Sequence, residues 1–183
     1  EIEPSIGGLV AAQPNVPVCR CTLAFLLSEL GRLDEARGHP EHLAAHDFGD
    51  LPSDGFVEVS LAHLAEVALV PDKIRYASGL YEFLKHSVEQ HLMVVDTRSL
   101  GSASRILGGL AALMRRWDAA EEHFAHAHAQ NDSMRAVPWK AHTHLDHARM
   151  LIRRDEPGDR ARARALLEAA VAVGEAPGLA PPL

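Results

Sequence analysis

Two pairs of histidines have a spacing that could hold a metal ion. The chain contains twelve histidines, and His123 and His126 are three residues apart, as are His144 and His147. Residues three apart share one face of a helix, and imidazole nitrogen is a common zinc ligand. Two adjacent helices that present these pairs could therefore bring four imidazoles together around one zinc ion.

A structural interpretation of the same histidines is favoured by their neighbours. His123 precedes Phe124 and His147 precedes Ala148, and both neighbours stand where one helix would pack against another. No Cys or Glu completes the spacing of a zinc peptidase. We expect partly exposed or structural histidines, with no bound metal and no cofactor; metal binding is the alternative.

The sequence carries no motif for catalysis. The segment "SIGGLV" (5–10) is not a phosphate-binding loop. It lacks the second Gly that the motif G-x-x-x-x-G-K-[ST] places five residues after the first, and it lacks the Lys that follows. Glu121 and Glu122 are adjacent, so on a helix their carboxylates point apart, as on a solvated face. Trp139, near the start of a helix in "VPWKAH", is expected to seal that helix against the preceding segment rather than to stack on a ligand. These observations predict that the chain is not an enzyme.

Charge, hydropathy and cysteine content exclude several classes of partner. The formal net charge is −7, whereas nucleic-acid-binding domains usually carry a basic stripe. No apolar run approaches the ~20 residues that span a bilayer. The two cysteines, Cys19 and Cys21, are two residues apart, and on one helix such side chains are poorly placed to bridge. We expect reduced thiols, no direct contact with nucleic acid or membrane, and a cytoplasmic location.

Apolar periodicity predicts helices throughout, and no stretch shows the alternation typical of a strand. Gly31, the loop "DFGDLPSDG" (47–55) and the loop "RRDEPGD" (153–159) separate helices. Pro40 is expected to kink the helix that contains it. The predicted helices are about 4–12, 17–30, 34–46, 56–69, 72–90, 99–115, 117–130, 137–154 and 159–174.

Four segments of the chain share one pattern of small and large residues. Each has a small residue near the middle of a first helix: Ala24, Ala65, Gly108 and Ala148. Each then has an alanine early in a second helix: Ala36, Ala77, Ala120 and Ala163. Four residues after that alanine stand Pro40, Tyr81, Phe124 and Leu167. Small residues let two antiparallel helices approach closely, and the large residue fills the gap to the next hairpin.

This pattern resembles the tetratricopeptide repeat (TPR), most clearly in "LGGLAALMRRWDAAEEHFAHA". The resemblance covers most of residues 17–174 as four degenerate units, and it implies an all-α solenoid of about four hairpins. The second-helix alanines recur every 41 to 43 residues rather than about every 34, which implies long inter-repeat loops. Residues 1–16 are then expected to be the end of a truncated upstream repeat, and 175–183 a flexible tail.

A narrower resemblance is carried by "LSELGRLDEA", "LAEVAL", "YASGLYEFL" and "RAVPWKAHTHLDHARMLIRR". These segments are similar to the C-terminal helical region of large bacterial ATP-dependent transcriptional regulators, in which an ATPase core precedes the TPR region. A cyclase-like domain or a LuxR-type DNA-binding domain often stands at one end of such proteins. The resemblance implies that this chain is a fragment of a signalling ATPase, and a stand-alone TPR adaptor is the alternative.

In a TPR solenoid the first helices line an inner groove that docks a peptide or a helix. The resemblance implies that Arg105 and Arg149 could meet an acidic helix or a phosphate group there; otherwise they are ordinary solvated arginines. The expected partner is a protein or peptide, or another domain of the parent chain. A homodimer formed through an apolar N-terminal end is a further expectation. The groove positions are Phe25, Glu66, Arg105, Leu145, Arg149 and Arg153.

Overall fold

The computed structural model describes residues 8, 10, 12, 16–36, 60, 62–65, 67, 74–94 and 98–174. The chain divides into two compact units. The N-terminal unit comprises Glu1–His86 and His91–Leu100, and the C-terminal unit comprises Ser87–Gln90 and Gly101–Leu183. The first two predicted repeats fall in the N-terminal unit and the last two in the C-terminal unit.

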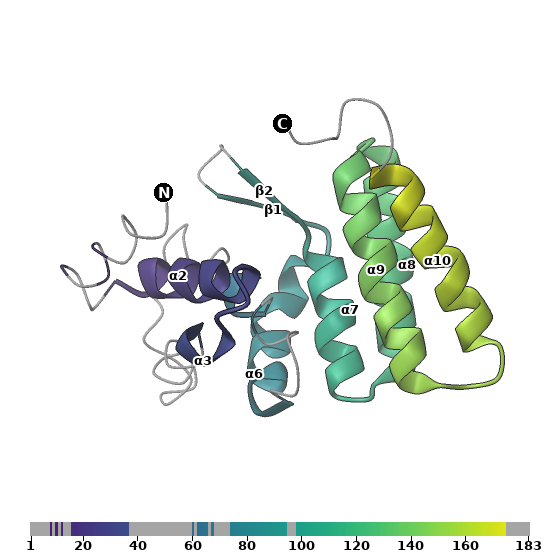
Figure 1. Ribbon diagram of the computed structural model, residues 1–183, viewed down its shortest axis with the longest axis horizontal. Helices are drawn as coiled ribbons and strands as arrows, with labels where there is room; N and C mark the ends of the chain where they lie inside the picture. Colours follow the sequence, from purple (N-terminus) through teal and green to yellow (C-terminus); the bar gives the residue numbers. More distant parts are fainter. Residues whose placement is uncertain are drawn as a thin grey trace. The chain divides into compact units, whose positions relative to one another are not determined.

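The described residues are mostly helical, as the sequence predicts (Figure 1). Helix α2 begins at Pro17, the residue at which the predicted repeat domain begins. Helix α10 ends at Gly174, the residue at which that domain is predicted to end. Most of the predicted helices at 4–12, 34–46 and 56–69 lie outside the described residues. The helices are α2 (Pro17–Glu29), α3 (Leu33–Ala36), α6 (Ile74–Leu84), the 3-10 turn η1 (Lys85–Ser87), α7 (Ala103–Leu113), α8 (Trp117–Ser133), α9 (Val137–Arg154) and α10 (Asp159–Gly174).

A two-stranded sheet, β1 (His91–Val94) paired with β2 (Arg98–Ser102), contradicts the expectation of no strand. The prediction of a helix over 99–115 was wrong at its start, because α7 begins at Ala103. Ser102 caps that helix, with its Oγ accepting from Ser104 N at 3.1 Å. Strands of four and five residues are too short to show a period, and their pairing is a contact between segments that periodicity does not report.

In the N-terminal unit, α2 packs on α3 through Leu23, Leu27 and Ala36. Phe25 stacks on His63, with ring centroids 4.9 Å apart. Cys21 is fully buried, and burial raises the pKa of its thiol to about 12, so it is an inert core residue. Both cysteines are free thiols, as expected.

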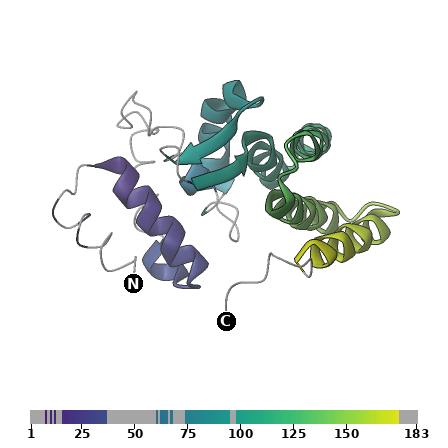
Figure 2. The same cartoon turned by 90° about the horizontal axis from the view of Figure 1, so that it is seen from above.

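The C-terminal unit consists of two helical hairpins, α7 with α8 and α9 with α10. The connections are three or four residues long, so each helix runs antiparallel to the one before it. Helix α9 packs against both α8 and α10, and Figure 2 shows α10 on the outer side of α9. Every residue of α7 is buried. The fully buried residues of this unit include Leu107, Ala111, Phe124, Ala148 and Leu151.

The same turn ends α2, α7 and α8. In α7, Arg115 N donates to Ala112 O and Arg116 N donates to Ala111 O, and the equivalent pairs close the other two helices. This is the Schellman arrangement, in which one residue has a left-handed conformation. That residue is Gly31 after α2, but Arg115 (φ 58) after α7 and Arg135 (φ 52) after α8. Only the first of the three turns contains the glycine that usually marks the end of a helix in a sequence.

The eight small residues of the predicted repeat pattern are all buried. They are Ala24, Ala36, Ala65, Ala77, Gly108, Ala120, Ala148 and Ala163. Their burial agrees with the predicted register within each hairpin. The arrangement of all four hairpins as one solenoid stays a prediction.

Candidate functional site

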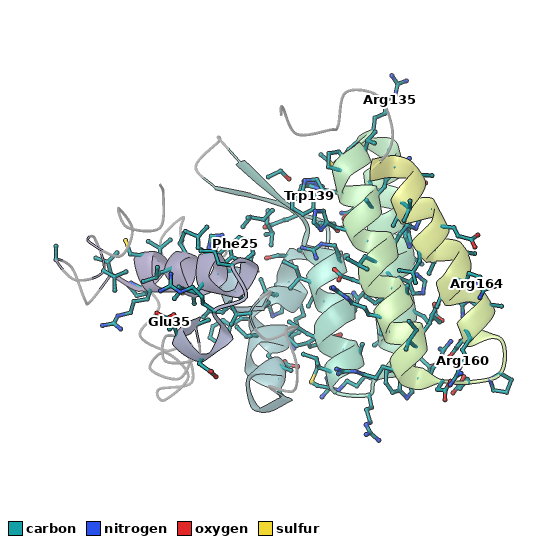
Figure 3. All side chains as sticks on the ribbon, in the orientation of Figure 1. Phe25, Glu35, Arg135, Trp139, Arg160 and Arg164 are labelled. Carbon is teal, nitrogen blue, oxygen red and sulfur yellow. The ribbon has the colours of Figure 1, made fainter. Side chains whose placement is uncertain are left out.

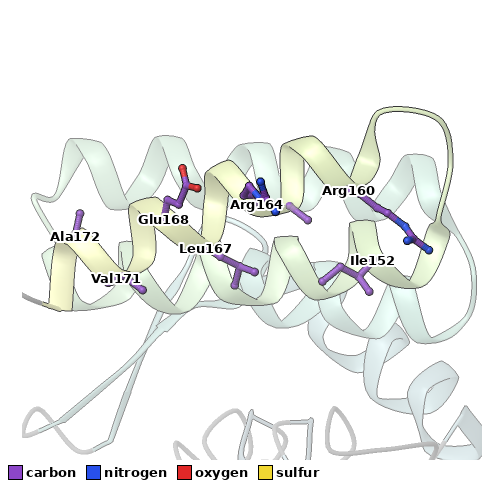
Figure 4. A pocket seen from close by; sticks show the side chains of 8 residues that line it. Ile152, Arg160, Arg164, Leu167, Glu168, Val171 and Ala172 are labelled. Atoms are coloured by element: carbon purple, nitrogen blue, oxygen red, sulfur yellow. The ribbon is translucent and has the colours of Figure 1, made fainter.

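An open groove runs along the outer face of the last hairpin, between α9 and α10. Its volume is about 780 Å³. Two of its apolar side chains, Ile152 and Val171, are 54% and 58% exposed. In Figure 4, Leu167 and Val171 lie along one side of α10 while Arg164 and Glu168 lie along the other. The lining residues are Ile152, Arg160, Ala163, Arg164, Leu167, Glu168, Val171 and Ala172.

The groove follows from the spacing of side chains on α10. Its lining residues recur at intervals of three and four, so they form one stripe along the helix. Ile152, near the end of α9, supplies the opposite wall. An exposed stripe of this kind is typical of a helix that packs against something beyond its own hairpin.

The preceding hairpin shows what covers this stripe elsewhere in the same unit. By the predicted register, Leu167 and Val171 of α10 correspond to Phe124 and His128 of α8. Phe124 is 0% exposed, and its ring stacks on His147 of α9 with centroids 5.0 Å apart. Leu167, by contrast, is only half-buried. Within 98–174, the face that α9 covers on the first hairpin is therefore open on the second.

The charged residues of the groove are largely unengaged. Arg160 pairs with Asp155, with Nε 2.9 Å from Oδ1, at the end of the groove nearest the α9–α10 turn. Arg164 and Glu168 are exposed and one turn apart, and neither forms an ion pair with any residue that the structure describes. Figure 3 shows Arg160 and Arg164 projecting from α10 into solvent. The groove thus combines an apolar floor with one positive and one negative side chain that have no ion-pair partner among the described residues.

A histidine cluster lies on the other side of α9, against α8. The Nε2 of His147 is 3.0 Å from Oε2 of Glu121, and its Nδ1 is 3.3 Å from Nε2 of His128. Because a carboxylate only accepts, His147 carries its proton on Nε2 and accepts at Nδ1 from the N–H of His128. The ring of His144 lies 4.8 Å from that of His128. Lys140 and Asp132, an ion pair, together with Leu166 of α10 complete the lining of a cavity of about 320 Å³ at this cluster.

Burial favours the neutral form of the three imidazoles of this cluster. It lowers the pKa of His128 to about 4, and the neighbouring His144 and His147 add to the effect. Burial also lowers the pKa of His144 and of His147. His128 and His147 are joined by a hydrogen bond, and His144 makes a ring contact with His128, so the three rings form a packing arrangement that joins α8 to α9.

Glu121 holds three helices together, which corrects the expectation that it belongs to a solvated face. Its carboxylate accepts from Arg162 of α10 at 2.8 and 3.0 Å, from Arg154 of α9 at 3.0 Å, and from His147. The hydrogen bonds from Arg162 are the main cause that lowers the pKa of Glu121. Glu122, its neighbour, is exposed, as expected.

Arg105 is buried, so the interpretation of it as a solvated arginine was wrong. Its side chain is 2% exposed, and Nη1 donates to Oδ2 of Asp146 at 2.6 Å. Arg149, 67% exposed, donates to the other oxygen of the same carboxylate. Trp139 covers the Arg105 guanidinium at 5.5 Å and lies on Gly101, where a Cβ would come within 2.6 Å of the indole (Figure 3). The expectation that Trp139 packs on the preceding segment is confirmed, whereas the sequence interpretation missed Asp146.

The remaining predicted groove residues belong to different elements of the two units. Phe25 is half-buried against His63 in the N-terminal unit. Leu145 is half-buried and Arg153 is exposed on α9, and neither lines the α9–α10 groove. Glu66 lies outside the described residues. Of the predicted positions that the structure describes in the C-terminal unit, Arg105 and Arg149 are joined through Asp146.

The four histidines of the alternative metal site are also separated. His126 contacts Ser104 Oγ at 2.9 Å and Glu89 at 3.2 Å, away from the pair on α9. The histidine that meets His144 and His147 is instead His128. In the part of the chain that the structure describes, no three or more His, Cys, Asp or Glu side chains are placed to hold a metal ion.

Comparison with known proteins gives no relative: no family model, no curated protein and no solved structure matches this chain. The likenesses to the TPR and to bacterial regulators are thus carried by the quoted segments alone. No helix among the described residues has the length and apolar character needed to cross a membrane.

Proposed function

We propose that this chain is a non-enzymatic interaction domain of the TPR type, and that its α9–α10 groove docks an amphipathic helix of a protein partner. The groove occupies the place on the last hairpin that α9 occupies on the preceding one. A docked helix would cover Ile152, Leu167 and Val171 as α9 covers Phe124. Burying such side chains is the main source of helix-docking affinity.

The observation that carries the proposal is the contrast between Phe124 and Leu167. Both stand four residues after the buried alanine of a second helix, and the first is fully buried while the second borders an open groove. A monomeric protein rarely leaves a contiguous apolar face uncovered. The contrast therefore favours a docking surface over a solvated end.

The resemblance to ATP-dependent regulators supplies a context for this activity. In such a parent protein, a cytoplasmic sensor segment of this kind would couple groove occupancy to the orientation of ATPase or DNA-binding modules. The gene sequence on either side of these 183 codons tests this part of the proposal. A phosphate-binding loop in the same reading frame supports the regulator context, and an open reading frame confined to the helical repeats supports the stand-alone adaptor.

The groove itself is tested with a peptide copied from α9. Residues 137–154 already pack on Phe124 and Glu121, and in the groove the residue that corresponds to Glu121 is Arg164. A peptide of this sequence with the substitution H147E, named the groove peptide, therefore offers a carboxylate to Arg164. We expect saturable binding of the labelled groove peptide, measured by fluorescence anisotropy, and weaker binding of the unsubstituted peptide.

Two matched variants locate the binding. Leu167→Asp places a charge on the floor of the groove and is expected to weaken peptide affinity at least about tenfold. Val137→Asp makes a similar apolar-to-acidic change at an exposed position outside the groove and should leave the affinity unchanged. Helicity measured by circular dichroism checks that both variants fold. Equal affinity for both variants would overturn the assignment of the groove.

A further inference from the structure

We propose that the helix seated in the α9–α10 groove is α10 of a second copy of this chain, in antiparallel orientation about a two-fold axis. This inference rests on the proposed function of the groove as a helix-docking site. Its basis is the charge pattern of Arg164 and Glu168. The two residues are exposed, lie one turn apart on the lining of the groove, and form no ion pair within the described part of the chain.

The pattern becomes complementary when α10 meets itself. The lining stripe on α10 runs from Arg160 to Ala172, so its midpoint falls at Leu166. With a two-fold axis at this point, Arg164 faces the partner's Glu168, and Glu168 faces the partner's Arg164. A two-fold interface repeats every contact, so two equivalent ion pairs form.

The apolar part of the groove is repeated in the same way. Ile152 and Val171 are more than half exposed in the single chain, and Leu167 lies between the two charged positions. Each copy would supply this set once, so the set is buried twice per dimer. Homodimer interfaces are characteristically apolar at the centre with polar groups at the rim.

Charge balance favours a second copy over a strongly charged partner. Arg160 is already paired with Asp155, which leaves one positive and one negative side chain on the groove. An acidic helix would be repelled by Glu168, and a basic helix by Arg164. The antiparallel copy satisfies both charges with the same sequence.

The experiment measures self-association of the full chain by sedimentation equilibrium. We expect a reversible dimer, with the dissociation constant raised at least tenfold by R164E and by E168R, because each change opposes like charges across the axis. Arg153→Glu, a charge reversal on exposed α9 outside the groove, should leave the constant unchanged. Circular dichroism verifies that all variants keep their helicity.

Mixing the two charge-reversal variants gives the sharpest outcome. In a mixed dimer the two substituted side chains face each other with opposite charges, and the native Glu168 of one copy faces the native Arg164 of the other. We expect an equimolar mixture of R164E and E168R chains to recover the wild-type dissociation constant.

Three results would overturn the inference: a monomeric wild-type chain, a dimer whose stability ignores both variants, or single-variant losses that mixing does not repair. A monomer that still binds the groove peptide would leave the docking function intact and assign the groove to a different protein. If the chain dimerises as expected but does not bind the groove peptide, the dimer proposal stands. Only the assumption that a copy of α9 fits the groove would then be wrong.

Discussion

Gly108 of α7 lies directly against the ring of Phe124 of α8. A Cβ built on Gly108 would stand 3.1 Å from three carbons of that ring. Phe124 cannot retreat easily, because it is fully buried and stacks on His147. The glycine therefore sets the separation of the two helices in the first hairpin of the C-terminal unit.

Replacing Gly108 by Val should lower the free energy of unfolding by about 1–3 kcal/mol, the usual cost of overpacking a core. The gain in helix propensity over glycine only partly offsets this cost. Urea denaturation followed by circular dichroism measures the change. Gly174→Ala is the control, since a Cβ there meets nothing within 4 Å. A Gly108→Val chain as stable as the control would contradict the contact.

Arg115→Gly is expected to stabilise the chain. Arg115 has φ 58, a left-handed conformation that an L-residue adopts at a cost and glycine adopts freely. Glycine also has greater conformational freedom in the unfolded chain, which offsets part of this benefit. We expect the free energy of unfolding to rise by about 0.5–1 kcal/mol. Arg135→Gly should behave alike, and Gly31→Ala should have the opposite sign. A loss of stability in both arginine variants would show that their side chains make contacts worth more than the strain.

The histidine cluster should make stability depend on pH. Burial lowers the pKa of His128 to about 4, below the 6.5 of a free imidazole. Between these values the unfolded chain binds more protons than the folded chain, so stability falls as the pH falls. The stabilisation is fully present above about pH 6.5 and is lost toward pH 4. A shift of this size corresponds to about 3 kcal/mol, and solvent screening of the partly exposed ring reduces the expected loss to an amount on the order of 2 kcal/mol.

The variant His128→Leu tests this dependence because it removes the most strongly shifted group. Comparing urea midpoints at pH 7 and pH 5 should show a smaller decrease for the variant than for the wild-type chain. Identical decreases would mean that His128 does not titrate as its surroundings imply.

Glu121→Gln should destabilise the junction of α8, α9 and α10. The neutral amide no longer balances Arg154 and Arg162, and the hydrogen bond from His147 weakens. We expect a loss of about 1–3 kcal/mol, the range for hydrogen bonds to charged groups. Glu122→Gln is the same change one residue away on the exposed face and should cost within about 0.5 kcal/mol. If the two variants unfold at the same denaturant concentration, Glu121 has no junction role.

Helix positions in the C-terminal unit could be predicted because apolar periodicity and turn residues agree there. The predicted helices 137–154 and 159–174 coincide with α9 and α10. The sheet of β1 and β2 could not be predicted from the sequence, because its two short strands are defined by their pairing with each other. The Schellman turns at Arg115 and Arg135 could not be predicted either, because the glycine that usually marks such a turn is absent from both.

The site was harder to predict than the fold. Arg105 and Asp146 are 41 residues apart in sequence, and their pairing depends on how α7 and α9 pack. The repeat register did identify Leu167 as a packing residue. The exposure of Leu167 depends on whether another helix packs against the α9–α10 groove. The pattern of small and large residues within one chain does not predict whether such a helix is present.

Methyl-selective NMR during a titration with the groove peptide shows which side chains the bound peptide contacts. We expect the methyl signals of Ile152, Leu167 and Val171 to shift with peptide concentration, while those of Leu30, exposed in the N-terminal unit, stay in place. Binding that shifts other methyl signals and leaves these three unchanged would contradict the groove as the docking site.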